Sequence, residues 1–542
     1  MKKFKFFVFV AALMTAVACS EPLNEVAEEE DSNTSEVATI ATTKSHWGNK
    51  IEDPYSVSNM RLAYKELMKN SGSTLSKAGV VEEDIAPTHL HLKFIPKNEE
   101  EWRILKKDTI LDVVPIPFDY DLEGFDGNYR DPECPKGQPT YQYTVVRIGY
   151  TLPDVEYIVL DSLFMPFEDD FEPTSISKST KFRPVWEQLE VESLKLTGNW
   201  EDGDEDFSLS KKKRVTPDGY VKMVDFSAGE IEKTVPNVRV YMNFSTHRSS
   251  TYTNASGYFE MPNSFRSRVH THVYFENTDY YACDKDGDVI AYYRGRVKME
   301  KNEIMTMNKK NEDNYAATIM CAGYDYYHNN KSTKYPPKGE RIRIGLQTHN
   351  NGYAIYYTTE FGGHYVKDGR DRIFIVESAW CKDQSKVKGE ITSDEDIFGK
   401  NMEIYATTIY GLAYVSLKNF VKVFSTADPS LLNESYAACV AYVFAEAIYG
   451  DEYNPSDFRN NYTKCNSGFF IDMIDGKDSD NEDFVEDYKL AQIENLIAKN
   501  KVTNFHDVAE RMPKLYANNT AGYLKKLASY WISWSKGAYK DK

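Results

Sequence analysis

The chain has 542 residues, of which 41% are hydrophobic and 14% aromatic, and its formal net charge is −18. This length predicts about three domains, because single hydrophobic cores stop growing at about 250–300 residues. The negative charge excludes nucleic acid as an expected partner, because binding to phosphates needs a basic face. The one compact basic run, 211–214, follows an acidic run at 201–206, and we interpret the pair as a solvated loop.

The first residues have the pattern of a secretory signal. Three lysines precede an apolar stretch that is too short to span a bilayer, and small residues then lead into Cys19. A cysteine at the cleavage point resembles the signal of bacterial lipoproteins, in which this cysteine is lipidated and becomes the mature N-terminus. We therefore expect a signal peptide over 1–18 and a lipid anchor on Cys19, which three acyl chains would make stable. The alternative is an ordinary secreted protein that has a cysteine here by chance.

Residues 19–50 predict a disordered acidic stalk, because they are rich in acidic residues, Ser and Thr and poor in bulky apolar ones. Acidic residues soon after a lipid cysteine resemble the export signal of Bacteroidota surface lipoproteins, which implies a lipid-anchored protein on the cell outer membrane. Residues 51–200 then predict an α+β N-terminal domain. Its expected elements are a helix over 59–68 and strands over 88–94, 141–146 and 155–160.

Residues 216–283 have the alternating pattern of β-strands throughout. Asn254 and Gly257 supply the conformations of a turn, and Phe259 is expected to point into the core. This Thr-Asn-x-x-Gly-x-Phe turn resembles that of the small carboxypeptidase-regulatory-like β-sandwich. Such a module implies a spacer or a binding platform, and it says nothing about catalysis.

Residues 284–542 predict a mainly helical C-terminal domain, so that the expected fold class is multidomain α+β. Apolar residues recur at helical spacing without internal proline in the two longest segments. The expected helices are 402–424, 430–450, 485–500, 504–512 and 521–536, with short strands such as 341–346 before them.

The segment 407–414 has the sequence Thr-Thr-Ile-Tyr-Gly-Leu-Ala-Tyr. Here the chain resembles a family of Bacteroidota lipoproteins with a zincin-like C-terminal domain, whose intact members have Thr-Thr-Ile-His-Glu-Leu-Ala-His. The resemblance extends over most of the chain. It includes 87–90, 94–97, 140–146, the turn of the β-sandwich and 323–327.

In an intact HExxH motif, two His side chains at i and i+4 bind Zn²⁺ and the Glu is the general base for the metal-bound water. The resemblance places the two histidines at Tyr410 and Tyr414, the base at Gly411 and a third ligand at Glu434. A neutral phenol is a poor zinc ligand, and glycine cannot accept a proton. No histidine occurs between His364 and His506. We therefore interpret this part as a pseudo-peptidase domain, with no catalytic residues, metal or other cofactor.

Other interpretations of these residues stay open. Tyr410 and Tyr414 either fill the vacated metal space as core aromatics or contact a ligand. His270 and His272 have the spacing that puts two side chains on one face of a strand, which makes them weak candidates for a metal site. The same spacing occurs in the strand expected over 88–94, at His89 and His91. Structural histidines are the commoner case for such pairs.

The function that we expect is binding: a surface lipoprotein that captures a peptide or glycan, in association with an outer-membrane importer of the SusC/SusD type. One alternative is a divergent hydrolase that uses Glu434 or Glu377 with a tyrosine as proton donor. Another is a scaffold that only packs against partner subunits. Six cysteines follow Cys19, and the sequence leaves open whether they are paired or free.

Overall fold

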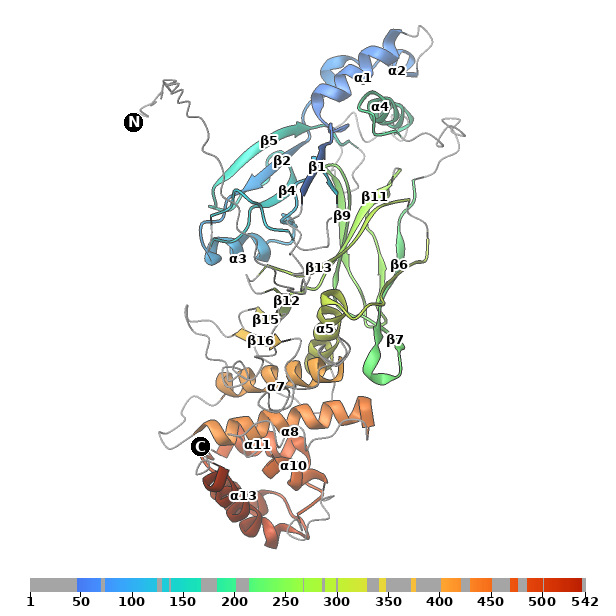
Figure 1. The fold of residues 1–542 in the computed structure, drawn as a ribbon. Helices are drawn as coiled ribbons and strands as arrows, with labels where there is room; N and C mark the ends of the chain where they lie inside the picture. Colours follow the sequence, from blue (N-terminus) through green and yellow to red (C-terminus); the bar gives the residue numbers. More distant parts are fainter. Residues whose placement is uncertain are drawn as a thin grey trace, which may run out of the picture. The chain divides into compact units, whose positions relative to one another are not determined.

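The computed structural model describes residues 46–69, 74–123, 129–135, 138–166, 183–200, 214–266, 268–284, 288–298, 301–328, 341–347, 372–376, 401–420, 429–450, 468–475, 485–500 and 502–538. All of them belong to one compact unit, Ser45–Lys542. The architecture is mixed α+β with several sheets, which confirms the expected fold class at this coarse level (Figure 1). The predicted signal peptide, Cys19 and the stalk up to residue 45 lie outside the described residues.

The N-terminal part contains an antiparallel three-stranded sheet with the order β4-β2-β5. Leu92 and Phe94 of the central strand β2 share a buried cluster with Leu105 of helix α3. Helix α3 begins where the side chain of Asn98 accepts a hydrogen bond from Glu101 N (3.0 Å), as expected of an N-cap residue. The elements are β1 (His46–Lys50), α1 (Val57–Lys69), α2 (Thr74–Ala78), η1 (Glu82–Asp84), β2 (His89–Phe94), α3 (Glu99–Lys107), β3 (Tyr120–Glu123), β4 (Gln142–Arg147), β5 (Tyr157–Leu163) and α4 (Arg183–Leu196).

Two sheets follow, which we call the two-sheet region (Figure 1). One has the order β10-β6-β14, with β7 also paired to β6, and the other has the order β13-β11-β8-β9. We expected the β-rich segment to end at residue 283, but β13 and β14 lie beyond it and pair with β11 and β6. The elements are β6 (Asp218–Asp225), η2 (Phe226–Ala228), β7 (Ile231–Thr234), β8 (Arg239–Phe244), β9 (His247–Tyr252), β10 (Tyr258–Glu260), β11 (Val269–Tyr274), β13 (Ala291–Val297) and β14 (Glu303–Met307).

The turn between β9 and β10 has the expected conformation. Gly257 has a φ of 73° and its N–H donates to Asn254 O (2.9 Å), while the Asn254 side chain accepts from Tyr258 N (3.1 Å). A Cβ at Gly257 would lie 2.8 Å from the carbonyl oxygen of Val221. Phe259 is buried, as predicted. The close approach and the positive φ together explain why glycine stands here.

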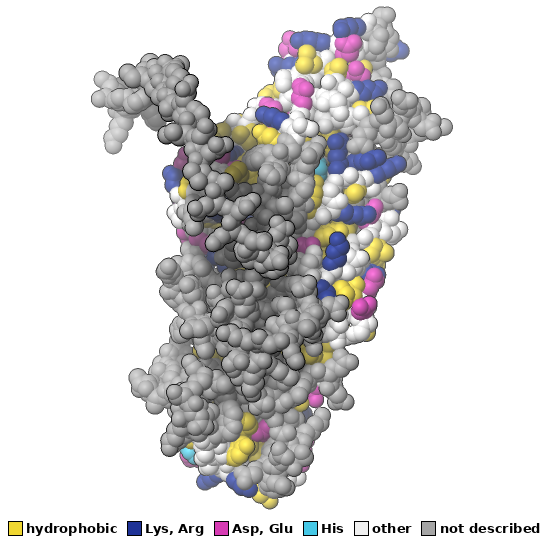
Figure 2. All heavy atoms as spheres, viewed as in Figure 1, with side chains coloured by type: hydrophobic (Ala, Val, Ile, Leu, Met, Phe, Trp, Pro, Cys, Tyr) yellow, Lys and Arg dark blue, Asp and Glu magenta, His cyan; other side chains and the backbone are white. Residues whose placement is uncertain are grey.

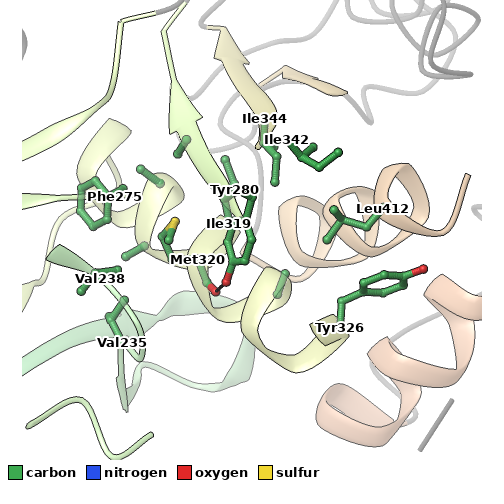
Figure 3. Close-up of a cluster of buried hydrophobic side chains, with 14 of the residues drawn as sticks. Val235, Val238, Phe275, Tyr280, Ile319, Met320, Tyr326, Ile342, Ile344 and Leu412 are labelled. Carbon is green, nitrogen blue, oxygen red and sulfur yellow. Dashed lines mark hydrogen bonds between the residues drawn. The ribbon is translucent and has the colours of Figure 1, made fainter. Parts of the chain in front are cut away.

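A parallel three-stranded sheet has the order β12-β15-β16, with strands β12 (Tyr280–Cys283), β15 (Ile342–Gln347) and β16 (Arg372–Val376). Helix α5 (Glu312–His328) contacts this sheet and also β6. The hydroxyl of Tyr280 donates to Met320 O of α5 (2.9 Å) within the buried cluster shown in Figure 3. Gly323 of α5 makes room for the Tyr280 ring, because a Cβ there would lie 2.3 Å from two ring carbons.

The C-terminal part is helical, as predicted. Its helices are α7 (Asn401–Phe420), α8 (Pro429–Tyr449), α10 (Gly468–Asp475), α11 (Leu490–Asn500), α12 (Phe505–Leu515) and α13 (Leu524–Ala538), with η5 (Ala521–Tyr523) before the last. Helices α10 and α13 are joined by a buried hydrogen bond from Trp531 Nε1 to Asp472 Oδ2 (2.7 Å). None of the described helices has both the length and the apolar character that a membrane crossing requires.

Four of the cysteines lie in described segments, and all four are in the thiol form: Cys134, Cys283, Cys321 and Cys439. On the face that Figure 2 shows, lysine and arginine side chains are interspersed with acidic and hydrophobic ones.

Candidate functional site

The segment 407–414 lies in the middle of α7, where the side chains are buried. Tyr410 and Tyr414 are one helical turn apart, and their exposed fractions are 2% and 7%. Their ring centroids lie 6.5 Å apart with an interplanar angle of 25°. Gly411, between them, is buried as well. This turn of α7 therefore belongs to the interior of the C-terminal part.

Helix α7 contacts both α5 and α8, and buried hydroxyl groups join it to α5. The hydroxyl groups of Tyr326 and Ser416 lie 2.6 Å apart, and Tyr405 donates to Asp325 Oδ2 (2.8 Å). Burial, followed by the negative charge of Asp325, raises the pKa of Tyr405 well above its usual value. Tyr405 is therefore a neutral donor at physiological pH, which suits a structural hydrogen bond better than proton transfer.

The first residue of α7 is held by a buried polar cluster. Asn401 Nδ2 donates to Asn314 Oδ1 (2.6 Å) and to Thr318 Oγ1 (2.7 Å), both on α5. Its Oδ1 accepts from Phe226 N (3.0 Å) of the two-sheet region. Because these polar atoms are paired in the interior, the cluster fixes the start of α7 against two other elements.

Helix α8 carries two further buried tyrosines that donate to carboxylates. Tyr436 donates to Glu494 of α11 (3.1 Å), and Tyr449 donates to Asp225 at the end of β6 (2.9 Å). Burial is the main cause that raises the pKa of both hydroxyl groups, and the neighbouring carboxylates add to it. These two tyrosines thus have a structural explanation, since the hydroxyl group of each satisfies a buried acceptor.

The residues of the motif do not have the chemistry of a zinc site. Tyr410 and Tyr414 offer neutral phenols and Gly411 offers no side chain. Glu434 lies on α8, but its side chain is not among those described, and Glu377 lies outside the described residues altogether. Within the parts of the chain that the structure describes, no three His, Cys, Asp or Glu side chains come together in a way that could hold a metal ion.

His270 and His272 lie on β11, in the interior of the two-sheet region, with exposed fractions of 9% and 2%. The hydroxyl of Tyr293, on the neighbouring strand β13, lies 2.6 Å from His270 Nδ1, and its ring stacks on that of His272 with centroids 4.8 Å apart. Burial, and then the proximity of His270, lowers the pKa of His272 well below its usual value. The pair is packed among aromatic rings, which favours the structural interpretation over a metal site.

His89 and His91 lie on β2 and are also buried. His89 Nδ1 lies 2.9 Å from Thr88 Oγ1, whereas the ring of His91 stacks on Phe118 with centroids 5.3 Å apart. Burial lowers the pKa of His91 to about 4. His91 Nε2 has no hydrogen-bond partner among the described residues. His91 is therefore a neutral aromatic group of the core at physiological pH.

A buried charge cluster around Glu276 was not predicted from the sequence. Arg239 of β8 (2.8 Å), Arg341 just before β15 (2.8 Å) and Lys106 of α3 (3.5 Å) all approach the Glu276 carboxylate. Burial lowers the pKa of Lys106 to about 8, and the cations, led by Lys106, keep the pKa of Glu276 well below its usual value against the effect of burial. The cluster joins segments that are distant in sequence, so no local pattern of the sequence could have signalled it.

Comparisons with known proteins give no family for the chain: no family model matches it, and neither does the sequence of any curated protein.

Proposed function

We propose that the protein is a lipoprotein of the outer-membrane surface, anchored through Cys19, which binds a peptide or glycan without hydrolysing it. In this proposal the C-terminal part is a zincin-like domain without its zinc site, and the two-sheet region is the carboxypeptidase-regulatory-like module. An outer-membrane importer of the SusC/SusD type is the proposed partner. The basis is the resemblance of the signal, the β9–β10 turn and the 407–414 segment to those of Bacteroidota lipoproteins.

The observation that carries the non-catalytic part of the proposal is the state of α7. Tyr410 and Tyr414 stand where the resemblance puts zinc-binding histidines, and both are buried with their rings stacked. A catalytic zinc site needs deprotonated or neutral-imidazole ligands and an open position for water. A pair of packed phenols, with glycine at the position of the general base, supplies neither. Catalysis by this motif would therefore require residues from elsewhere.

Metal content and turnover test the proposal together. The full-length chain, purified without chelators, is analysed by mass spectrometry with and without added zinc, and incubated with peptide and polysaccharide libraries. We expect less than about 0.1 equivalent of zinc in both samples, because an intact structural or catalytic site would hold close to one equivalent. We also expect no hydrolysis. About one equivalent of retained zinc, with turnover that a chelator abolishes, would overturn the proposal.

If zinc is retained, a matched pair of variants identifies its ligands. Tyr410→Phe keeps the ring of the motif and removes its hydroxyl, and His272→Phe does the same for the ring nitrogens of β11. Loss of zinc in the second variant alone would place the metal at the buried histidines. Loss in the first alone would show that the tyrosine of α7 is a ligand.

A further inference from the structure

Strand β5 begins with four consecutive large apolar residues whose side chains are exposed. The exposed fractions are 44% for Tyr157, 47% for Ile158, 47% for Val159 and 42% for Leu160. Successive side chains of a strand point to opposite faces, so both faces of β5 are open along this stretch. We call these four residues the β5 apolar edge. Exposed apolar residues are ordinary when scattered, but a contiguous group marks an interaction surface.

The backbone of β5 is open as well. Strand β5 is at the edge of the β4-β2-β5 sheet, and in the part of the chain that the structure describes β2 is the only strand that pairs with Tyr157, Ile158 and Val159. Leu160 lies at a bulge and has no partner residue on β2. Ile95 N donates to Glu156 O (2.8 Å), so residue 156 faces β2. Because backbone groups of an antiparallel strand alternate in direction, the N–H and C=O groups of Tyr157 and Val159 face away from β2.

The open stretch has defined ends. Past the apolar edge, Leu163 forms a bridge with Ser56, and Phe164 N donates to Tyr55 O (2.9 Å). The pairing of β2 with β5 is interrupted by a bulge after Val159, while Tyr157 to Val159 keep a regular register with β2. A regular edge of this kind can accept an added strand, whereas bulges and covered ends prevent such pairing.

Charges at the two ends select the kind of strand that fits. Asp154 and Glu156 are exposed before the apolar edge, with Lys97 bound to Glu156 (2.9 Å), and Asp161 follows the edge. If two copies of β5 paired in antiparallel fashion through the outward groups of Tyr157 and Val159, Ile158 of one copy would face Ile158 of the other. Asp161 of each copy would then lie next to Asp154 and Glu156 of the other, and like charges brought this close destabilise a strand pair. The ends therefore disfavour a second copy and favour a strand with basic ends.

We propose that the β5 apolar edge binds an extended segment of a partner protein, which adds to the sheet as a further strand. Its centre carries apolar, β-branched residues that pack on Tyr157 to Leu160, and its ends carry Lys or Arg that face Glu156 and Asp161. Backbone hydrogen bonds from Tyr157 and Val159 supply affinity, and the side chains supply selectivity. This inference rests on the proposed function, because it assigns the bound ligand to the peptide class and gives it a site.

The test uses the full-length chain and a fluorescent peptide with alternating valine and threonine between terminal arginines, measured by fluorescence anisotropy. The same peptide with terminal glutamates tests the charge requirement. Val159→Pro removes the outward N–H without removing a bond to β2, because proline is tolerated at such edge positions. We expect it to weaken binding at least about tenfold. The matched control Ile148→Ala, at an exposed apolar residue outside β5, should change affinity less than about twofold.

A charge-reversed chain keeps the test independent of any effect of proline on folding. In the double variant Glu156→Lys, Asp161→Lys we expect the preference to reverse, so that the glutamate-ended peptide binds more tightly. Hydrogen exchange of the Tyr157 and Val159 amides should slow when the arginine-ended peptide is added to the native chain.

Several outcomes would overturn the inference: no binding of either peptide, equal binding to Val159→Pro, an unchanged preference in the charge-reversed chain, or slow exchange of these amides before peptide is added. Concentration-dependent dimers that Val159→Pro abolishes would show a second copy as the occupant and would also overturn it. Binding at β5 accompanied by cleavage of the peptide would instead overturn the proposed function and support the β5 site.

Discussion

Helix α7 and strand β5 each contain a stretch that is rich in large apolar residues, and the two stretches have opposite environments. In α7, Tyr410 and Tyr414 are buried and stacked, and neighbouring hydroxyl groups are hydrogen-bonded to α5. In β5, four apolar side chains are exposed on both faces of an edge strand. The sequence of α7 resembles a zinc-binding motif, but the residues at the motif positions pack in the interior. The strand has no catalytic motif, but it keeps an open surface.

The apolar side chains of α7 and of β5 differ in how much they contribute to the stability of the fold. Burying a large apolar side chain contributes about 1.5–3 kcal/mol, so the residues of α7 are explained by folding alone. The side chains of β5 receive only part of this contribution, because about half of each remains in contact with water. Their presence on the surface therefore calls for a partner. Substitutions at Tyr410 and Val159 test this contrast directly, and changes at His91 and Gly323 test how closely the interior is packed.

The largest effect is expected from Tyr410→Ala, which should destabilise the fold by about 3–5 kcal/mol, as for other large aromatic residues truncated in a core. The matched control is Tyr157→Ala on β5, where the same change should cost less than about 1 kcal/mol, because the ring is 44% exposed. Denaturant titration followed by circular dichroism measures both values. Similar losses in the two variants would mean that the contrast between interior and edge is wrong.

Acidification should destabilise the protein through His91. An unfolded chain protonates this residue near pH 6.5, whereas burial lowers its pKa to about 4 in the folded protein. The unfolded state therefore binds more protons between these values, and the contribution of His91 is complete above pH 6.5 and is lost as the pH falls towards 4. The loss amounts to about 3 kcal/mol.

The measurement is the difference in the free energy of unfolding between the native chain and His91→Phe at pH 7 and at pH 4. The comparison is needed because Asp53 acts in the opposite direction. Burial raises its pKa to about 6, so its contribution decreases as the pH rises from about 4 to 6. The phenylalanine variant should lose less stability on acidification than the native chain does. Equal losses in both chains would place His91 in contact with water.

Local patterns predicted the elements with the clearest periodicity, but not helices α3, α4, α5 and α10. Helix α8 was expected over 430–450 and covers Pro429–Tyr449, and β2 was expected over 88–94 and covers His89–Phe94. These segments have strong periodicity and clear boundaries. Strands β13 and β14 were missed because each is stabilised by pairing with a strand from another part of the chain, β11 and β6. Their pairing is a tertiary property that a local pattern does not encode.

For the candidate site too, the sequence did not predict which residues come together in the fold. The resemblance of 407–414 to a zinc-binding motif singled out Tyr410, Gly411 and Tyr414, but burial was only one of the two environments that remained open for the tyrosines. The cluster at Glu276 could not be found, because its cations come from α3, β8 and the start of β15. The 155–160 run was predicted as a strand. Its continuous apolar character is usual for a strand buried on both faces, and only the sheet order places it at an edge.

Gly323→Ala should cost about 1–3 kcal/mol, the usual range for overpacking. The new methyl group would lie 2.3 Å from ring carbons of Tyr280, whose hydroxyl is held by Met320 O and whose ring is buried. This clash outweighs the gain of about 1 kcal/mol that alanine brings to a helix. Gly522→Ala is the matched control, since nothing lies within 4 Å of its Cβ position. Unchanged or increased thermal stability of Gly323→Ala would show that α5 is not packed closely on β12.

The smallest effect is expected from Val159→Thr, which should change the free energy of unfolding by less than about 0.5 kcal/mol. The side chain is 47% exposed, and threonine keeps the branched shape that suits a strand. The same substitution at Val240, which is fully buried in β8, is the control and should cost well over 1 kcal/mol, because it buries a hydroxyl group. If Val159→Thr proved equally costly, another part of the chain would cover β5, and its apolar residues would need no partner. If the change is neutral, stability does not explain these residues, and binding remains the reason for keeping them at the edge.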